Sequence, residues 1–476
     1  MKCLKNLRRI DDMVQIVPYL FSLGCARAWM TLTFASPTAV FAPFNVDPHV
    51  LFDYVYVIAG VAVALLAHRV APLQEHASAK ALALGAMLAS SACIIGASYA
   101  PEAAAVLQII AALVGGCGFC LLLLLHSEAL VPLGLVRIAL YTAGSRFMAV
   151  PMVFFCEGLD DVRFNCALIV LPLVAVACVS YAYGTTPAED RPSNMQTGFA
   201  FPWKPIALLS VFSFAYGLRS SQLAAGAGIH SSLSTALVMG VFFLVVYFFS
   251  HRFSISALIR SPLVLMVCGF VLIPLEGVFG PVVSSYLISM ANTLMSLLMS
   301  LLLYDFSKRL GVAVVVFMGF AKVSTLFSVW GNDCANLLAR TPLAPQMQDA
   351  VIMAVVVLLV LCCTLILLSE KDITATWGIH VSSPTGKDPA FSRDEFLTRR
   401  CDEVSRKGRL SPREDEILRL MAKGKSNLAM ENELFIAPGT LKAHIQHIYV
   451  KLDIHSRKDL MALFEAPADE KPLQQP

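Results

Sequence analysis

Residues 410–464 read LSPREDEILRLMAKGKSNLAMENELFIAPGTLKAHIQHIYVKLDIHSRKDLMALF, and this stretch decides the fold of the C-terminal part of the chain. Ser411, Pro412 and Glu414 predict the start of a helix, because they combine a hydroxyl cap, a proline at the first helical position and a carboxylate that can bond back to the cap. Apolar residues at helical spacing then give this helix an inward face. We therefore expect a small helical domain to begin here.

A short second helix is predicted from Ser426 to Leu434, and a third helix from Pro438 after the turn 435–437. The third helix has two faces, because aliphatic residues recur at helical spacing along one side of it. The inward residues are Leu441, Ile445, Ile448 and Leu452, and the outward residues are Lys442, Ala443, Gln446 and His447. Glutamine can bond an adenine edge and lysine a guanine edge, so this outward face suits the major groove of DNA. A fourth amphipathic segment after Ser456 is available for packing or for dimerisation.

The same residues carry a specific resemblance. The matching positions are Leu410 to Glu414, Glu416, Leu418, Gly424, Ser426, Asn427, Leu434, Ile436, Pro438 to Thr440, Lys442, His444, Ile448, Tyr449, Lys451, Leu452 and His455 to Arg457. In this pattern the segment resembles the DNA-binding domain of LuxR/FixJ/NarL-type regulators. The resemblance implies a four-helix domain with a helix-turn-helix, bound to double-stranded promoter DNA as a homodimer and in contact with RNA polymerase.

The resemblance also assigns roles to individual residues. Lys442, Ala443 and Gln446 would meet base edges, and His447 would lie on the same DNA-facing side. Ser426, Asn427, Thr440 and Lys451 would lie near phosphates. The alternative is a helical bundle that binds protein or has lost DNA binding.

The rest of the chain has the composition of a membrane protein, because 57% of the 476 residues are hydrophobic and only 14% are charged. Apolar runs long enough to cross a bilayer predict twelve spans. They lie at about 15–36, 49–68, 80–99, 103–125, 134–156, 164–183, 204–226, 231–250, 261–279, 282–304, 311–330 and 348–368. A polar connection, 184–203, divides them into two halves of six. The predicted fold class is thus all-α, a polytopic bundle followed by a small helix-turn-helix domain.

Two halves of six helices resemble the major facilitator architecture. The connection 68–72 lacks the Gly/Asp/Arg-rich signature of that family, which weakens the case for transport. Cations in the connections gather on one side: Arg69, Lys80, Arg137, Arg191, Lys204, Arg252, Arg260, Lys308 and Arg309, with Arg163 and Arg340 on the other. By the positive-inside rule both termini are cytoplasmic, in the inner membrane of a prokaryote.

These patterns predict four regions. Residues 1–368 form the membrane domain, 369–408 a cytoplasmic linker, 409–465 the DNA-binding domain and 466–476 a disordered tail. A capping box at Ser392 predicts a linker helix to about Lys407. This helix packs on the DNA-binding domain, pairs between subunits, or is only a spacer.

Four cations, Arg27, Arg146, Arg219 and Lys322, fall inside predicted spans, where an unpaired charge is costly. Acidic residues lie towards the ends of spans, so the interior carries surplus positive charge. We expect these cations to bind a small anionic molecule, such as a carboxylate or a phenolate. The alternative is structural pairing with helix carbonyls or with residues such as Asn292.

We find no constellation of catalytic residues, no cofactor motif and no metal-spaced cluster; His444, His447 and His455 are interpreted as packing or DNA-facing residues. The leading hypothesis is a one-component transcription regulator that senses a small molecule through its membrane domain. The rival is a secondary transporter of the major facilitator type whose tail is regulatory or vestigial.

Overall fold

The computed structural model describes residues 10–35, 47–186, 201–224, 230–249 and 255–367 apart from 311 and 343, together with parts of 401–460. Within 401–460 the positions 403, 407, 423–429, 431–433, 435–437, 453 and 455–459 fall outside the description. The regular elements of the described residues are all helices. The chain divides into two compact units, Met1–Ile379 and His380–Pro476. An all-α fold is therefore confirmed.

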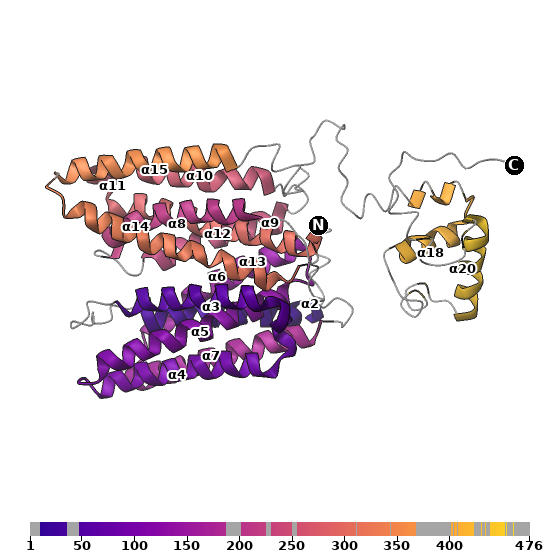
Figure 1. Cartoon of the computed structure of the whole chain (residues 1–476), viewed down its shortest axis with the longest axis horizontal. Helices are drawn as coiled ribbons and strands as arrows, with labels where there is room; N and C mark the ends of the chain where they lie inside the picture. Colours follow the sequence, from indigo (N-terminus) through magenta and orange to yellow (C-terminus); the bar gives the residue numbers. More distant parts are fainter. Residues whose placement is uncertain are drawn as a thin grey trace. The chain divides into compact units, whose positions relative to one another are not determined.

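The first group of membrane helices precedes the connection 187–200 (Figure 1). It consists of α2 (Ile10–Met30) with the short π-helix η1 (Thr31–Ala35), α3 (Pro48–Val70), α4 (Ala77–Tyr99), α5 (Ala104–Leu130), α6 (Leu135–Glu157) and α7 (Asp161–Gly184). Local sequence fixes some of the starts. Asp47, for example, caps α3 by accepting a 2.9 Å hydrogen bond from the backbone N–H of His49, and Pro48 follows at the first helical position.

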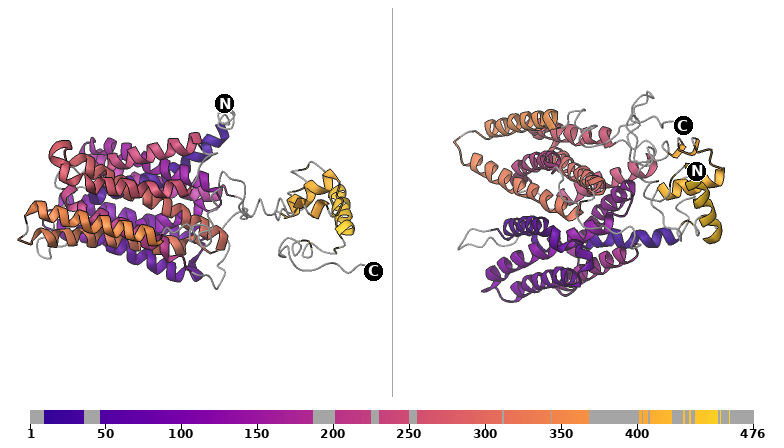
Figure 2. Two further views of the ribbon diagram at one scale, coloured as in Figure 1. Left: turned by 90° about the horizontal axis from the view of Figure 1, so that it is seen from above. Right: turned by 45° about the vertical axis from the view of Figure 1, so that its right-hand side comes forward.

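The second group comprises α8 (Trp203–Ala224), α9 (His230–Phe249), α10 (Ile255–Val271), α11 (Glu276–Phe279), α12 (Pro281–Leu310), α13 (Val314–Ala321), α14 (Val323–Ala339) and α15 (Pro345–Leu367). Figures 1 and 2 show the two groups side by side. Every one of the twelve predicted spans overlaps a helix among the described residues. The eleventh is divided at Lys322 into α13 and α14, so the regular helix is interrupted where a cation stands in a predicted span.

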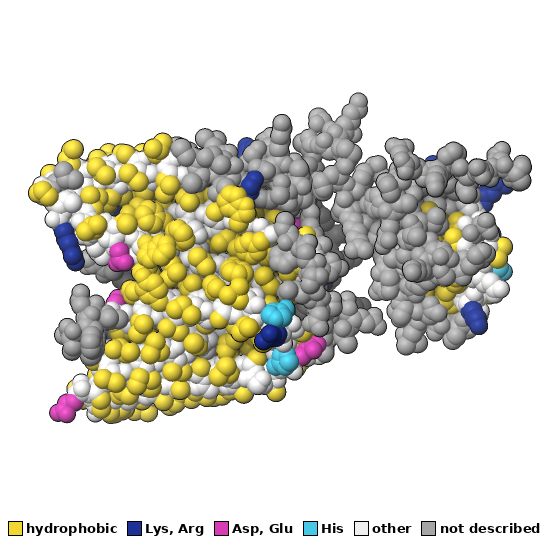
Figure 3. All heavy atoms as spheres, in the orientation of Figure 1, with side chains coloured by type: hydrophobic (Ala, Val, Ile, Leu, Met, Phe, Trp, Pro, Cys, Tyr) yellow, Lys and Arg dark blue, Asp and Glu magenta, His cyan; other side chains and the backbone are white. Residues whose placement is uncertain are grey.

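Seven helical segments of the described residues, with α13 and α14 counted as one, are long and apolar enough to cross a membrane. Three further apolar helices, Leu233–Phe248, Arg260–Val271 and Ala350–Val360, are shorter within the described residues. Large hydrophobic side chains face outward, among them Ile58, Phe154 and Phe155, the last two each 71% exposed. Figure 3 shows one face of this unit covered by hydrophobic side chains. Such a surface suits lipid rather than water, and the protein is a multi-pass membrane protein.

The two groups touch through glycines of α3 and α13. A Cβ added to Gly319 would lie 2.4 Å from the carbonyl oxygen of Gly60, and one added to Gly60 would lie 2.9 Å from Cγ of Lys322. Small residues let two helix backbones approach closely inside a membrane. This contact joins the halves beside the break at Lys322.

The C-terminal unit has a separate hydrophobic core. Helices α18 (Pro412–Ala422) and α20 (Pro438–Leu452) supply most of it. Its buried members are Cys401, Val404, Ile417, Leu418, Met421, Ala422, Met430, Leu441, Ile448 and Leu460. Cys401 and Val404 come from the linker, so of the alternatives for the linker helix, packing on the DNA-binding domain is the one observed.

Candidate DNA-binding surface and buried cations

The predicted cap of α18 forms as a reciprocal pair of hydrogen bonds. The backbone N–H of Ser411 donates to Oε2 of Glu414 at 2.7 Å, and the backbone N–H of Glu414 donates to Oγ of Ser411 at 3.4 Å. This capping box satisfies two backbone donors that a helix start leaves unpaired. It fixes where α18 begins and therefore how its apolar face meets α20.

Helix α20 has the two faces that its sequence predicts. Leu441 and Ile448 are buried in the core, whereas the opposite side carries a run of exposed side chains. The exposed residues that were expected to face DNA are Thr440, Lys442, Ala443, Gln446, His447 and Lys451. The other two expected contacts, Ser426 and Asn427, lie outside the described residues. The structure thus places six of the eight expected residues on one accessible helix.

Lys451 lies in an ion pair. Its Nζ donates to Oε2 of Glu414 at 2.6 Å, and the Glu414 side chain is only 5% exposed. Burial alone raises the pKa of Glu414, but the hydrogen bonds from Lys451 and Ser411 outweigh it and hold that pKa at about 2. Glu414 is therefore a carboxylate at neutral pH, and it ties the end of α20 to the start of α18. A phosphate contact by Lys451 would have to share its ammonium group with Glu414.

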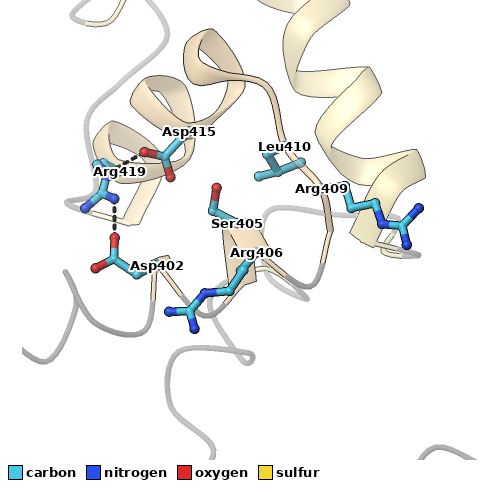
Figure 4. Close-up of a pocket in the computed structure, with 7 residues that line it drawn as sticks. All are labelled: Asp402, Ser405, Arg406, Arg409, Leu410, Asp415 and Arg419. Carbon is cyan, nitrogen blue, oxygen red and sulfur yellow. Dashed lines mark hydrogen bonds and ion pairs between the residues drawn. The ribbon is translucent and has the colours of Figure 1, made fainter.

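The linker is clamped to α18 by a second set of charges. Arg419 pairs with Asp415 one turn earlier at 2.8 Å and also with Asp402 of the linker (Figure 4). These two carboxylates raise the pKa of Arg419 above its ordinary value, so it stays charged. The linker segment ends in a turn in which the N–H of Gly408 donates to the carbonyl oxygen of Val404 at 2.9 Å.

A pocket of about 510 Å³ lies between this clamp and the turn. Its lining residues are Asp402, Ser405, Arg406, Arg409, Leu410, Asp415 and Arg419. Figure 4 shows Arg409 directed away from the ion-paired group. The linker therefore contacts the helical domain in two ways, through the buried Cys401 and Val404 and through the ion pair of Asp402 with Arg419. The sequence pattern alone had left open whether the linker packs on this domain.

Three of the four predicted membrane cations interact with one another. Arg146 is in electrostatic range of Arg27, and Lys322 is in range of both arginines. Arg146 is 6% exposed, and its guanidinium donates to the carbonyl oxygen of Thr293 and to Oγ of Ser296, both at 3.3 Å. The alternative of structural pairing with helix carbonyls thus holds in part, because the carbonyl oxygen of Thr293 accepts a hydrogen bond from Arg146.

That pairing is incomplete. Nε of Arg27 and Nε of Arg146 are buried without a hydrogen-bond partner among the described residues. Two tyrosines lie near the cluster: Nζ of Lys322 lies 5.1 Å from the ring centre of Tyr56, and Tyr304 is in electrostatic range of Arg146. Sequence reasoning did not identify these tyrosines, because aromatic residues are common in any membrane helix and carry no spacing signal.

Arg219 has a different environment. It is buried and paired with Glu276, which also accepts a hydrogen bond from Ser284. Glu276 stands at the start of α11, towards the end of a predicted span, so it did not suggest itself as a partner for a residue of α8. The structure therefore groups Arg27, Arg146 and Lys322, hereafter the cation cluster, and accounts for Arg219 as half of an ion pair.

Comparison with known proteins identifies each unit. Residues 408–464 match the family model "Bacterial regulatory proteins, luxR family". Oxygen regulatory protein NreC of Staphylococcus haemolyticus is 46% identical over 52 residues, which are 11% of this chain and 24% of NreC. A protein of Mycobacterium bovis described as an HTH-type transcriptional regulator is 39% identical over 54 residues, 11% of this chain and 6% of that protein. The chain thus spans less than a quarter of the length of these relatives.

The membrane unit is similar to solved transporter structures. A bacterial homologue of the iron transporter ferroportin, in an outward-facing state, matches with a TM-score of 0.55 and 10% identity, over 78% of this chain and 100% of that one. At that identity the likeness concerns the fold alone. The protein therefore combines a transporter-like helical bundle with a LuxR-type helix-turn-helix domain.

Proposed function

We propose that the protein is a membrane-embedded, one-component transcription regulator. The observation that carries the proposal is the union, in one chain, of a LuxR-family domain at residues 408–464 and a multi-pass helical bundle. A DNA-binding domain has access to the genome only from the cytoplasm. This agrees with the charge bias of the connections, which places both termini on the cytoplasmic side of a prokaryotic inner membrane.

The exposed side of α20 is the proposed reading surface. Lys442, Ala443 and Gln446 face base edges, His447 lies beside them, and Thr440 and Lys451 face phosphates with Ser426 and Asn427. The support for the six residues of α20 is their shared exposure on a helix whose other face is buried, whereas Ser426 and Asn427 lie outside the described residues. A homodimer would place two such helices on adjacent turns of the major groove, and RNA polymerase is the expected further partner.

The cation cluster is the proposed sensor. Three cations within electrostatic range of one another, two with buried and unpaired Nε atoms, leave uncompensated positive charge inside the bundle. Three carboxylates of the described part of this unit pair with other residues: Asp53 with His49, Asp160 with Arg163 and Glu276 with Arg219. An anion would offset the charge of the cluster. The tyrosine rings favour one that also carries an aromatic or apolar surface, such as a phenolate or an aromatic carboxylate.

Coupling between the units passes through the linker. Asp402 pairs with Arg419 of α18, and Cys401 and Val404 lie in the core that α18 helps to form. A ligand that favours one arrangement of the two membrane halves would shift the point from which the linker leaves the bilayer. That shift would change how readily two DNA-binding domains pair on a promoter.

The rival function is secondary transport with a regulatory or vestigial tail. The observation in its favour is the fold likeness to a transporter homologue. The two functions differ in what deletion of the tail does. If the full-length chain transports an anion into proteoliposomes and still does so after residues 391–476 are removed, the rival is supported. If the deletion abolishes promoter occupancy and neither the full-length nor the shortened chain transports an anion, the regulator is supported.

The decisive experiment maps the chain on the genome by crosslinking and sequencing in living cells. Wild-type protein is compared with a Lys442→Ala/Gln446→Ala double variant and with Arg163→Ala, which removes an exposed cation of the membrane unit. We expect discrete promoter peaks for the wild type and for Arg163→Ala, and none for the double variant. Identical maps for all three proteins would reject the assigned reading helix.

A further inference from the structure

Three potential metal ligands meet at the junction of α18 and α20. Glu414, His444 and His447 each present one ligand atom, and these atoms all lie within 4.8 Å of one another. The glutamate is buried, His444 is half-buried and His447 is exposed. Two histidines three positions apart lie on the same side of a helix, and the carboxylate comes from the neighbouring helix.

The donor set fits a particular class of ion. Two imidazole nitrogens and one carboxylate oxygen suit Zn²⁺ and related divalent transition metals, and they leave a fourth position for water. Ligand atoms around a tetrahedral zinc ion are roughly 3.4 Å apart, given bond lengths of about 2.1 Å. The separations of up to 4.8 Å therefore need to shorten by at most about 1.4 Å, which rotation of the exposed His447 side chain can supply.

The capping box prepares Glu414 for this role. Ser411 and Lys451 both donate to Oε2, so Oε1 is the oxygen that an ion would take. The carboxylate is charged at neutral pH and is held in place by the start of α18. A cation at Oε1 would repel the ammonium group of Lys451, whose side chain is 38% exposed and can swing into solvent.

We propose that Glu414, His444 and His447 bind a Zn²⁺-class divalent metal ion, and that the bound ion competes with DNA. When the metal binds, the imidazole of His447 turns away from the DNA-reading surface and Lys451 separates from Glu414. The metal ion and its bound water then lie beside the helix face that enters the DNA groove. The metal site stands on its own geometry. Only the competition rests on the proposed DNA-binding function.

The site is tested with Co²⁺ as a spectroscopic probe on the full-length chain in detergent. We expect one saturable Co²⁺ per chain with visible absorption of a tetrahedral site, displaced by Zn²⁺, and without the ultraviolet charge-transfer bands that cysteine ligands give. His447→Gln should weaken binding about 10-fold to 100-fold, by analogy with losses at metal sites. His76→Gln, which changes an exposed histidine of the membrane unit, should bind like the wild type. Equal affinity in wild type and His447→Gln would overturn the site.

Competition is tested with sheared duplex DNA. Stoichiometric Zn²⁺ should weaken DNA binding of the wild type at least about 10-fold and leave that of His447→Gln unchanged. If Zn²⁺ binds but DNA affinity does not fall, the competition is wrong. If neither protein binds DNA in the absence of metal, the proposed function fails while the Co²⁺ titration still decides the metal site.

Discussion

Nζ of Lys451 lies 2.6 Å from Oε2 of Glu414, so a side chain expected to face a DNA phosphate is also a structural tie between the last turn of α20 and the first turn of α18. The two residues are 37 positions apart, and Glu414 continues the buried side of α18 that Ile417, Leu418 and Met421 form. Lys451 thus contributes to the stability of the domain and also belongs to the surface that is expected to contact DNA. Variants at this position will mix the two effects unless they are separated.

Lys451→Met should destabilise the C-terminal unit by about 1.5–3 kcal/mol, because it leaves the buried Glu414 carboxylate without its charged donor. Gln446→Ala on the exposed side of the same helix is the matched control and should change stability by less than about 0.5 kcal/mol. Urea-dependent proteolysis of the full-length chain, read as the release of the C-terminal unit, measures both. Equal urea midpoints for the two variants would show that the ion pair contributes nothing.

Lys442→Ala should weaken specific promoter binding by about 1–3 kcal/mol and relax the base preference at one position, because a lysine that bonds a guanine edge is removed. Thr440→Ala should lower the affinity for all sequences more evenly, since a phosphate contact carries little sequence information. Selection of binding sites from a random DNA pool, with each protein at the same salt concentration, distinguishes the two. A uniform loss for Lys442→Ala would assign that lysine to phosphate instead.

Arg146→Ala should abolish the transcriptional response to an inducing anion, since it removes a cation of the cluster that the bonds to Thr293 and Ser296 hold in place. Arg219→Ala should act differently, because it leaves the half-buried Glu276 without its cation and lowers thermal stability in detergent rather than the response. Reporter expression against a panel of carboxylates and phenolates, together with melting temperatures, gives both readings. A normal response in Arg146→Ala would show that the cation cluster does not sense the inducing anion.

The outcomes for individual residues show what a sequence pattern can predict. The helix start at Ser411 and the outward face around Gln446 follow from local rules of capping and periodicity, and both were predicted. The long apolar runs likewise located the membrane helices. These features depend on neighbours within a turn or two of the chain.

Pairings across the fold were not predictable in the same way. Nothing near Arg219 in sequence indicates Glu276, 57 positions away, and nothing near Asp402 indicates Arg419. The same holds for Lys322, whose place beside Tyr56 depends on how α3 and α13 pack. Four cations in predicted spans therefore looked equivalent, whereas the structure separates an arginine paired with a carboxylate from three cations that form no ion pair among the described residues.

Gly319→Val should bias the protein between its membrane arrangements, because α3 and α13 belong to different halves and their backbones touch there. The added side chain would begin 2.4 Å from the Gly60 carbonyl oxygen, so this contact can persist only if the helices separate. If the halves rock against each other during sensing, the inducer concentration for half-maximal response should move about tenfold, which corresponds to about 1.4 kcal/mol. Gly85→Val is the control, since a Cβ at Gly85 of α4 has open space around it. A monodisperse Gly319→Val protein with the same dose response as Gly85→Val would show that closure of α3 against α13 takes no part in signalling, and the coupling would then have to run through another pair of helices.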